Sequence, residues 1–155
     1  MVTMSLFCEH EVKLISESWK LMALDLDNHG LNFFLKLFKE YPVYEEKFFP
    51  DINGDRKKLK RHGGIVMKAL GKLVGFLETG KIIAIVNTIK GIANSHSKRG
   101  VLVQQFTPVC DILLKYLGEA FGDQLSNEGT ATWKKFLDIF VSVINEAYDE
   151  IKNKK

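Results

Sequence analysis

Apolar residues recur at three- and four-residue spacing along most of the chain, which is the period of an amphipathic helix. A loop is expected at 50–56, and Gly80 and Gly100 mark breaks between helices. We found no convincing alternating segment, so the pattern predicts an all-α protein. The predicted helices lie at about 9–26, from Asn28 (a candidate N-cap) to about Tyr41, at 57–78, 82–97, 102–121 and 126–152, with a short helical turn that begins at Pro42 and ends near Phe48-Phe49-Pro50.

The composition fits one domain spanning residues 1–155. Of these 155 residues 46% are hydrophobic and 26% are charged, which is enough to bury a core. A net charge of +3 is too small to indicate nucleic-acid or membrane binding. The longest apolar run, at 82–86, is too short to span a bilayer. With no signal-peptide pattern and only two cysteines, we expect a cytoplasmic protein, monomeric or weakly dimeric, without nucleic-acid or membrane partners.

Two of the four histidines stand where a helical stripe predicts an apolar residue. His62 fills the missing position between Leu59 and Val66, and His96 continues a stripe of isoleucines that ends at Ile92. A buried imidazole needs hydrogen bonds or a metal for its nitrogens. For either histidine alone, the simpler interpretation is a core residue bonded to a backbone carbonyl. As a pair on consecutive helices, the two can instead face each other across a flat cofactor such as haem.

The neighbouring residues leave alternatives open. Gly63 and Gly64 would let the backbone approach a ring, or would allow close packing with another helix. The basic run at 56–61 is expected to be a solvated helix start, and the alternative is that one member pairs with a haem propionate. His10 is expected to be solvated and His29 to lie at a helix–helix contact. A further expectation is that Cys110 is a small core residue and Cys8 a free thiol.

This ordered set of residues resembles the globin family, and within it the neuroglobin type. The resemblance covers nearly the whole chain, with three departures. Ile65 stands where neuroglobins place a lysine near a haem propionate, the 34-residue separation of the two histidines indicates an insertion near Gly80, and a cysteine pair of some neuroglobins is absent. The matching residues are Trp19, His29-Gly30, Pro42 with Phe48 six residues later, His62-Gly63 with Val66, His96 with Gly100-Val101, Phe106 and Trp133.

The resemblance implies a globin fold of about seven to eight helices in a three-over-three sandwich around haem b, with the fourth short helix absent. It implies His96 as the proximal iron ligand. His62 would be either a distal hydrogen-bond donor or an endogenous sixth ligand, and the sixth-ligand role is favoured. In place of the missing lysine, Arg61, Lys98 or Arg99 would meet the propionates. The implied cofactor-binding residues are Phe34, Phe48, His62, Val66, Ile92, His96, Val101 and Phe106.

The implied function is reversible binding of O₂, CO or NO. On this interpretation the chain is not an enzyme, and NO dioxygenation or nitrite reduction would be secondary activities. The alternatives are a haem enzyme that uses one of those reactions, and an electron-transfer protein or redox sensor. A haem-free helical interaction module is a third class, and it predicts that the chain takes up no haem.

Overall fold

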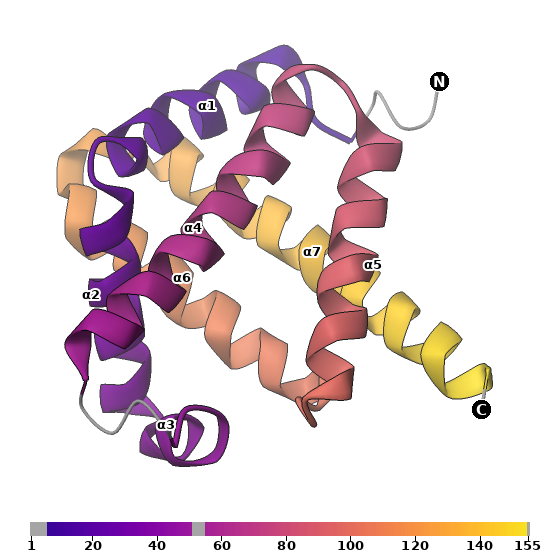
Figure 1. Cartoon of the computed structure of the whole chain (residues 1–155). Coiled ribbons are helices and arrows are strands. Elements are labelled where there is room, and N and C mark those ends of the chain that lie inside the picture. Colours follow the sequence, from indigo (N-terminus) through magenta and orange to yellow (C-terminus); the bar gives the residue numbers. More distant parts are fainter. Residues whose placement is uncertain (1–5, 51–54, 155) are drawn as a thin grey trace.

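The computed structural model describes residues 6–50 and 55–154. Within these ranges the chain forms seven α-helices and two 3₁₀ turns and has no strand, which confirms the all-α prediction (Figure 1). The expected loop at 50–56 and the expected lack of a short fourth helix concern a segment whose residues 51–54 lie outside the described ranges. The helices are α1 (Glu9–Ala23), α2 (Leu26–Glu40), α3 (Pro42–Phe48), α4 (Arg56–Glu78), α5 (Ile82–Lys98), α6 (Phe106–Phe121) and α7 (Asn127–Asn153), and the turns are η2 (Val103–Gln105) and η3 (Gly122–Gln124).

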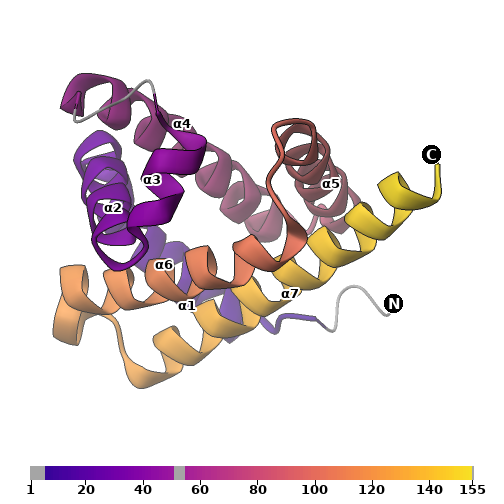
Figure 2. The ribbon, with the colours of Figure 1, turned by 90° about the horizontal axis from the view of Figure 1, so that it is seen from below.

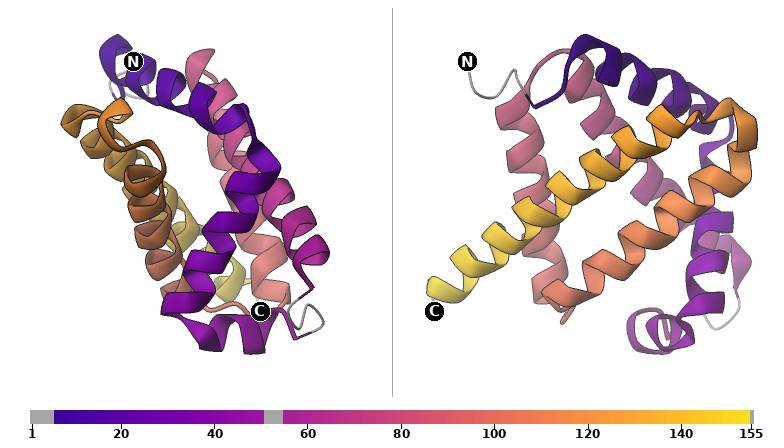
Figure 3. Two further views of the ribbon diagram at one scale, coloured as in Figure 1. Left: turned by 90° about the vertical axis from the view of Figure 1, so that its left-hand side faces the viewer. Right: turned by 180° about the vertical axis from the view of Figure 1, so that it is seen from behind.

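The helices form two layers, which Figure 2 shows from below: α6 and α7 lie side by side across one side, and α4 and α5 lie on the other. Helix α2 crosses α4, α5 packs on α7, and α1 contacts both α4 and α7. Figure 3 shows from behind how α7 runs diagonally across the molecule. Helices α4 and α5, which carry His62 and His96, therefore face the α6–α7 pair.

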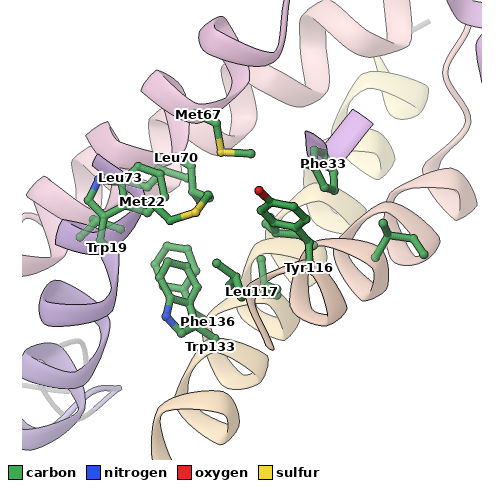
Figure 4. Close-up of a cluster of buried hydrophobic side chains, with 14 of the residues drawn as sticks. Trp19, Met22, Phe33, Met67, Leu70, Leu73, Tyr116, Leu117, Trp133 and Phe136 are labelled. Carbon is green, nitrogen blue, oxygen red and sulfur yellow. The ribbon is translucent and has the colours of Figure 1, made fainter. Parts of the chain in front are cut away.

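The core between the layers is built around two tryptophans (Figure 4). Trp133 of α7 is fully buried, and its ring lies 6.3 Å from that of Trp19 in α1. Its indole Nε1–H donates a 2.7 Å hydrogen bond to Ser18 Oγ, so the one polar atom of this large side chain has a partner. This buried contact joins α1 to α7.

Helices α2 and α4 meet backbone to backbone. A Cβ atom added to Gly30 would lie 2.4 Å from the carbonyl carbon of Gly63, and one added to Gly63 would lie 2.5 Å from that of Gly30. No side chain fits at either position. Close helix packing is therefore what Gly63 provides, and it fixes the position of α4 directly beside His62.

Two helix boundaries differ from the prediction. The first helix ends at Ala23, and the N-cap of α2 is Asp25, whose non-helical backbone (φ −155°, ψ 62°) separates the two helices. The predicted cap, Asn28, lies inside α2 and donates to the Asp25 carboxylate. The helix predicted from residue 102 begins at Phe106. Pro108 explains this start, because proline has no N–H and its ring clashes with the carbonyl four residues earlier, so it is tolerated only in a first turn.

Candidate functional site

His96, in the last turn of α5, is oriented by its own helix. Its Nδ1 lies 2.7 Å from the carbonyl oxygen of Ile92 and 3.3 Å from Ser95 Oγ. A carbonyl oxygen can only accept, so Nδ1 carries the proton, and the neutral ring keeps its lone pair on Nε2. The carbonyl bond is the one that a core histidine would make, but it uses only Nδ1. It leaves Nε2 as a ligand atom of fixed direction, as an anchored metal-binding histidine requires.

The chain turns directly after His96 and is tied down there. Gly100 has φ +82°, a conformation that suits glycine, and the amide of Val101 donates back to the His96 carbonyl oxygen. The carbonyl oxygen of Val101 in turn accepts from the hydroxyl of Tyr148 in α7 at 2.8 Å. The buried ring of Phe106 lies 5.5 Å from the imidazole of His96. The predicted residues Ile92, Val101 and Phe106 thus surround His96.

His62, in the second turn of α4, lies between aromatic rings from other segments. Its ring centroid is 5.1 Å from that of Phe34 in α2 and 4.8 Å from that of Phe49, which follows α3. Within the described ranges no hydrogen bond involves a ring nitrogen of His62. The surroundings are apolar and supply no protein partner from those residues, so this imidazole is suited to meet an external group.

Two further predicted residues lie on the same side. Val66, one turn after His62, is half-buried and packs against the core. Phe48 packs edge-on against Tyr44 at 5.9 Å, and it is the next residue, Phe49, whose ring contacts His62. Sequence reasoning missed Phe49, although the Phe-Phe pair marks the position. The contact of Phe48 with a cofactor stays a prediction.

The two imidazoles interact electrostatically. Burial lowers the pKa of His62 below its ordinary value of 6.5, and the charges of His96 and Arg99 lower it further. Neutral imidazole is the form that binds a metal. At neutral pH His62 is therefore in the neutral form that can bind a metal.

The other singled-out residues are a second pair of histidines, a cysteine and the basic run that leads up to His62. His29 Nδ1 is 2.7 Å from the hydroxyl of Tyr116, at the predicted contact between helices, and His10 is exposed beside Glu128. Cys110 is largely buried, which raises the pKa of its thiol to about 12. The basic residues of the 56–61 run are all exposed, as expected for a solvated helix start.

These residues fit a haem between α4 and α5. The donor set consists of one histidine with a free, oriented Nε2 and a second on the neighbouring helix, and the surrounding side chains are aromatic or branched aliphatic. Within the described part of the chain, no group of three or more histidine, cysteine, aspartate or glutamate side chains is placed to hold a metal ion. The fit is therefore to an iron that brings its own equatorial ligands.

An all-α fold with an anchored histidine and a second, aromatic-flanked histidine on consecutive helices is the arrangement of a helical haem protein. The globin family model matches residues 31–144, and the chain belongs to the globin family. A globin of Aequiyoldia eightsii is 30% identical over 145 residues, which are 90% of this chain and 95% of that protein. The predicted globin fold is confirmed.

Other relatives are named as enzymes. An anaerobic nitrite reductase of Brassica napus is 27% identical over 138 residues, covering 85% of this chain and 86% of its own length. Another, of Oryza sativa subsp. japonica, is 28% identical over 141 residues, covering 90% and 94%. The expectation that the chain is not an enzyme is wrong in the light of these relatives. Gas binding and nitrite reduction use the same open iron position, so the residue types could not separate them.

The expected similarity to the neuroglobin type in particular is not supported by these relatives. Among the helices of the described ranges, none has the length and apolar character needed to cross a membrane.

Proposed function

We propose that this chain binds haem b between α4 and α5, with His96 Nε2 as the proximal ligand of the iron. The observation that carries the proposal is the 2.7 Å bond from His96 Nδ1–H to the Ile92 carbonyl, which leaves Nε2 free and oriented. The remaining pocket would be formed by Phe34, Phe48, Val66, Ile92, Val101 and Phe106 together with His62.

The bound iron would supply a ferrous centre that coordinates O₂, CO or NO and can give up one electron. The protein residues control access to it. The rings of Phe34 and Phe49 exclude water from the His62 side, and His62 either donates a hydrogen bond to a bound gas or ligates the iron itself. We favour the second role for the resting state, because burial keeps His62 neutral and no described protein group competes for its nitrogens. The observed gas affinity would then be the affinity of the open site multiplied by the fraction of molecules in which His62 has dissociated.

A second function, nitrite reduction, is favoured by the names of the relatives. Conversion of nitrite to NO consumes one electron and two protons and releases water. The electron would come from the ferrous iron. His62 would have to leave the iron first, and its N–H could then donate a hydrogen bond to a nitrite oxygen. Because protons are consumed, the rate of NO formation should rise as the pH falls.

The visible spectrum of the haem-loaded ferrous protein without added gas tests the haem proposal. We expect sharp, split bands of a six-coordinate low-spin iron, lost in His62→Ala and retained in His29→Ala, a matched half-buried histidine outside the site. His96→Ala should retain haem poorly. Split bands that persist in His62→Ala would refute its role as sixth ligand, and the lack of a haem spectrum after adding haem would overturn the whole proposal.

Anaerobic mixing of the ferrous protein with nitrite tests the second function. NO should form, and it should form faster in His62→Ala, where the iron position is open. No NO at any pH from this variant, in a sample that binds CO, would exclude nitrite reduction.

The remaining attributes are also part of this proposal. We propose that residues 1–155 form one globin domain, cytoplasmic and monomeric or weakly dimeric, whose partners are the gases O₂, CO and NO rather than nucleic acid or membrane. The small net charge and the two cysteines support it.

A further inference from the structure

The charge of the chain is unevenly distributed around the two histidines. Residues 56–110, which contain α4 and α5, hold eleven of the 22 lysines and arginines but only one of the 19 acidic residues, Glu78. A net charge of +3 for the whole chain therefore conceals a strongly positive segment. This segment carries both His62 and His96.

Three cations of this segment lie within three positions of one of the two histidines in the sequence. Arg61 precedes His62 in α4, and Lys98 and Arg99 follow His96 at the end of α5. All three side chains are exposed, and within the described ranges none of them forms an ion pair. We call Arg61, Lys98 and Arg99 the cationic rim.

Several cations elsewhere on the molecule are paired with acidic neighbours. On α1 and α7, Lys13 lies 3.9 Å from Glu17, Lys134 lies 3.0 Å from Asp138, and Lys135 lies 3.0 Å from Glu11. The rim differs from these residues because it has no such partner among the described residues. Its positive potential is therefore available to an external anion.

The stability of α4 does not account for its basic start. The first turn of α4 contains three basic and no acidic residues, although the positive end of the helix dipole lies there and favours acidic side chains. Arg61 lies one position before His62 in α4, and Arg99 is the C-cap residue of α5, three positions after His96. The rim therefore lies on the two helices that carry the proposed site.

We infer that the cationic rim selects small anionic ligands of the iron, nitrite first among them, over neutral gases. The inference rests on the proposed haem site. Positive charge at the mouth of an apolar pocket raises the local concentration of anions and their association rate, and it leaves O₂, CO and NO unaffected. The two propionates of a haem would neutralise at most two of the eleven cations.

The test compares an anion with a neutral ligand at the same iron. Azide and imidazole are titrated into the ferric haem-loaded protein, and nitrite and CO are mixed with the ferrous protein, at ionic strengths from about 10 mM to about 300 mM. Both ligands of each pair must displace His62. The ratio of their affinities or rates is therefore independent of the fraction of molecules in which His62 has dissociated. The variant Arg61→Gln/Lys98→Gln/Arg99→Gln is compared with Lys13→Gln/Lys20→Gln/Lys134→Gln, which removes three charges from α1 and α7.

At low salt we expect the rim variant to lose about 3- to 10-fold in azide affinity and in nitrite rate, with imidazole and CO nearly unchanged. The control variant should behave like the wild type. The difference between the rim variant and the wild type should vanish at high salt. Should the triple variant not retain haem, Arg99→Gln alone gives the same comparison with a smaller change.

Three results overturn the inference. One is that neither salt nor the rim variant alters the ratio of the affinity or rate for the anion to that for the neutral ligand. Another is faster haem release from the rim variant with an unchanged ratio, which would mean that the rim only holds the propionates. A chain that takes up no haem would remove the proposed function as well. Azide selectivity without NO formation from nitrite would support the inference while refuting nitrite reduction.

Discussion

The crossing of α2 and α4 makes a strong prediction for Gly63→Ala. The added Cβ would lie 2.5 Å from the Gly30 carbonyl carbon, 2.7 Å from its oxygen and 2.9 Å from its Cα. Carbon atoms in contact normally lie about 3.5–4.0 Å apart, so the helices must separate by about 1 Å. The obstructing atoms are all backbone and cannot rotate aside. We therefore expect a loss near the top of the overpacking range, about 3 kcal/mol in free energy of unfolding.

Gly75→Ala in the same helix is the matched control. A Cβ at Gly75 would meet nothing within 4 Å, so only the better helix propensity of alanine remains, about 0.5–1 kcal/mol of stabilisation. Gly64→Ala should fall between the two, because its Cβ would meet the Asp27 side chain at 2.6 Å, and a flexible side chain can move.

Urea unfolding followed by far-ultraviolet circular dichroism measures the differences between these proteins. The double variant Gly30→Ala/Gly63→Ala should cost less than the sum of the single variants, because the first methyl group already separates the helices. If Gly63→Ala unfolds within about 0.5 kcal/mol of Gly75→Ala, the backbone contact does not fix α4 and the reasoning fails.

Three further predictions concern other parts of the molecule. At pH 8, iodoacetamide should label exposed Cys8 and spare Cys110, because thiolate is the reactive form and burial raises the Cys110 pKa to about 12. Labelling of Cys110 should rise with pH and become complete in denaturant. Rapid modification of Cys110 at pH 8 in the folded protein would contradict its burial. Ser18→Ala should destabilise the fold by about 1–3 kcal/mol in urea unfolding, because it leaves the buried Trp133 N–H without its acceptor, and an unchanged midpoint would show that this bond contributes nothing. Asp55→Ala should cost about 1 kcal/mol in the same assay, because the Asp55 carboxylate accepts from two amides in the first turn of α4, whereas Asp55→Asn should be nearly neutral.

The helices could be predicted closely from the sequence because each buries one continuous apolar stripe. The stripes that contain His62 and His96 placed both histidines on the correct helices before any contact was known. The predicted boundaries failed where local backbone chemistry decides. Asp25, with a non-helical backbone, separates α1 from α2 between two leucines, only one of which packs on the core, and the ring of Pro108 sets the start of α6.

Helix periodicity alone pointed only to the two histidines of the candidate site. Ile92 and Phe106 were expected there because of the resemblance to globins. Phe49 was missed because it follows α3 in a non-helical conformation, and no periodic pattern indicates which ring of the Phe-Phe pair turns inward. The difference between a gas carrier and a nitrite reductase is harder still. Both need the same histidines, so the residues that separate them must act on charge rather than on ligation. By this inference Arg61, Lys98 and Arg99 distinguish an anion from a neutral gas. The salt dependence of the nitrite-to-CO rate ratio is therefore more informative about function than any substitution of His62 or His96.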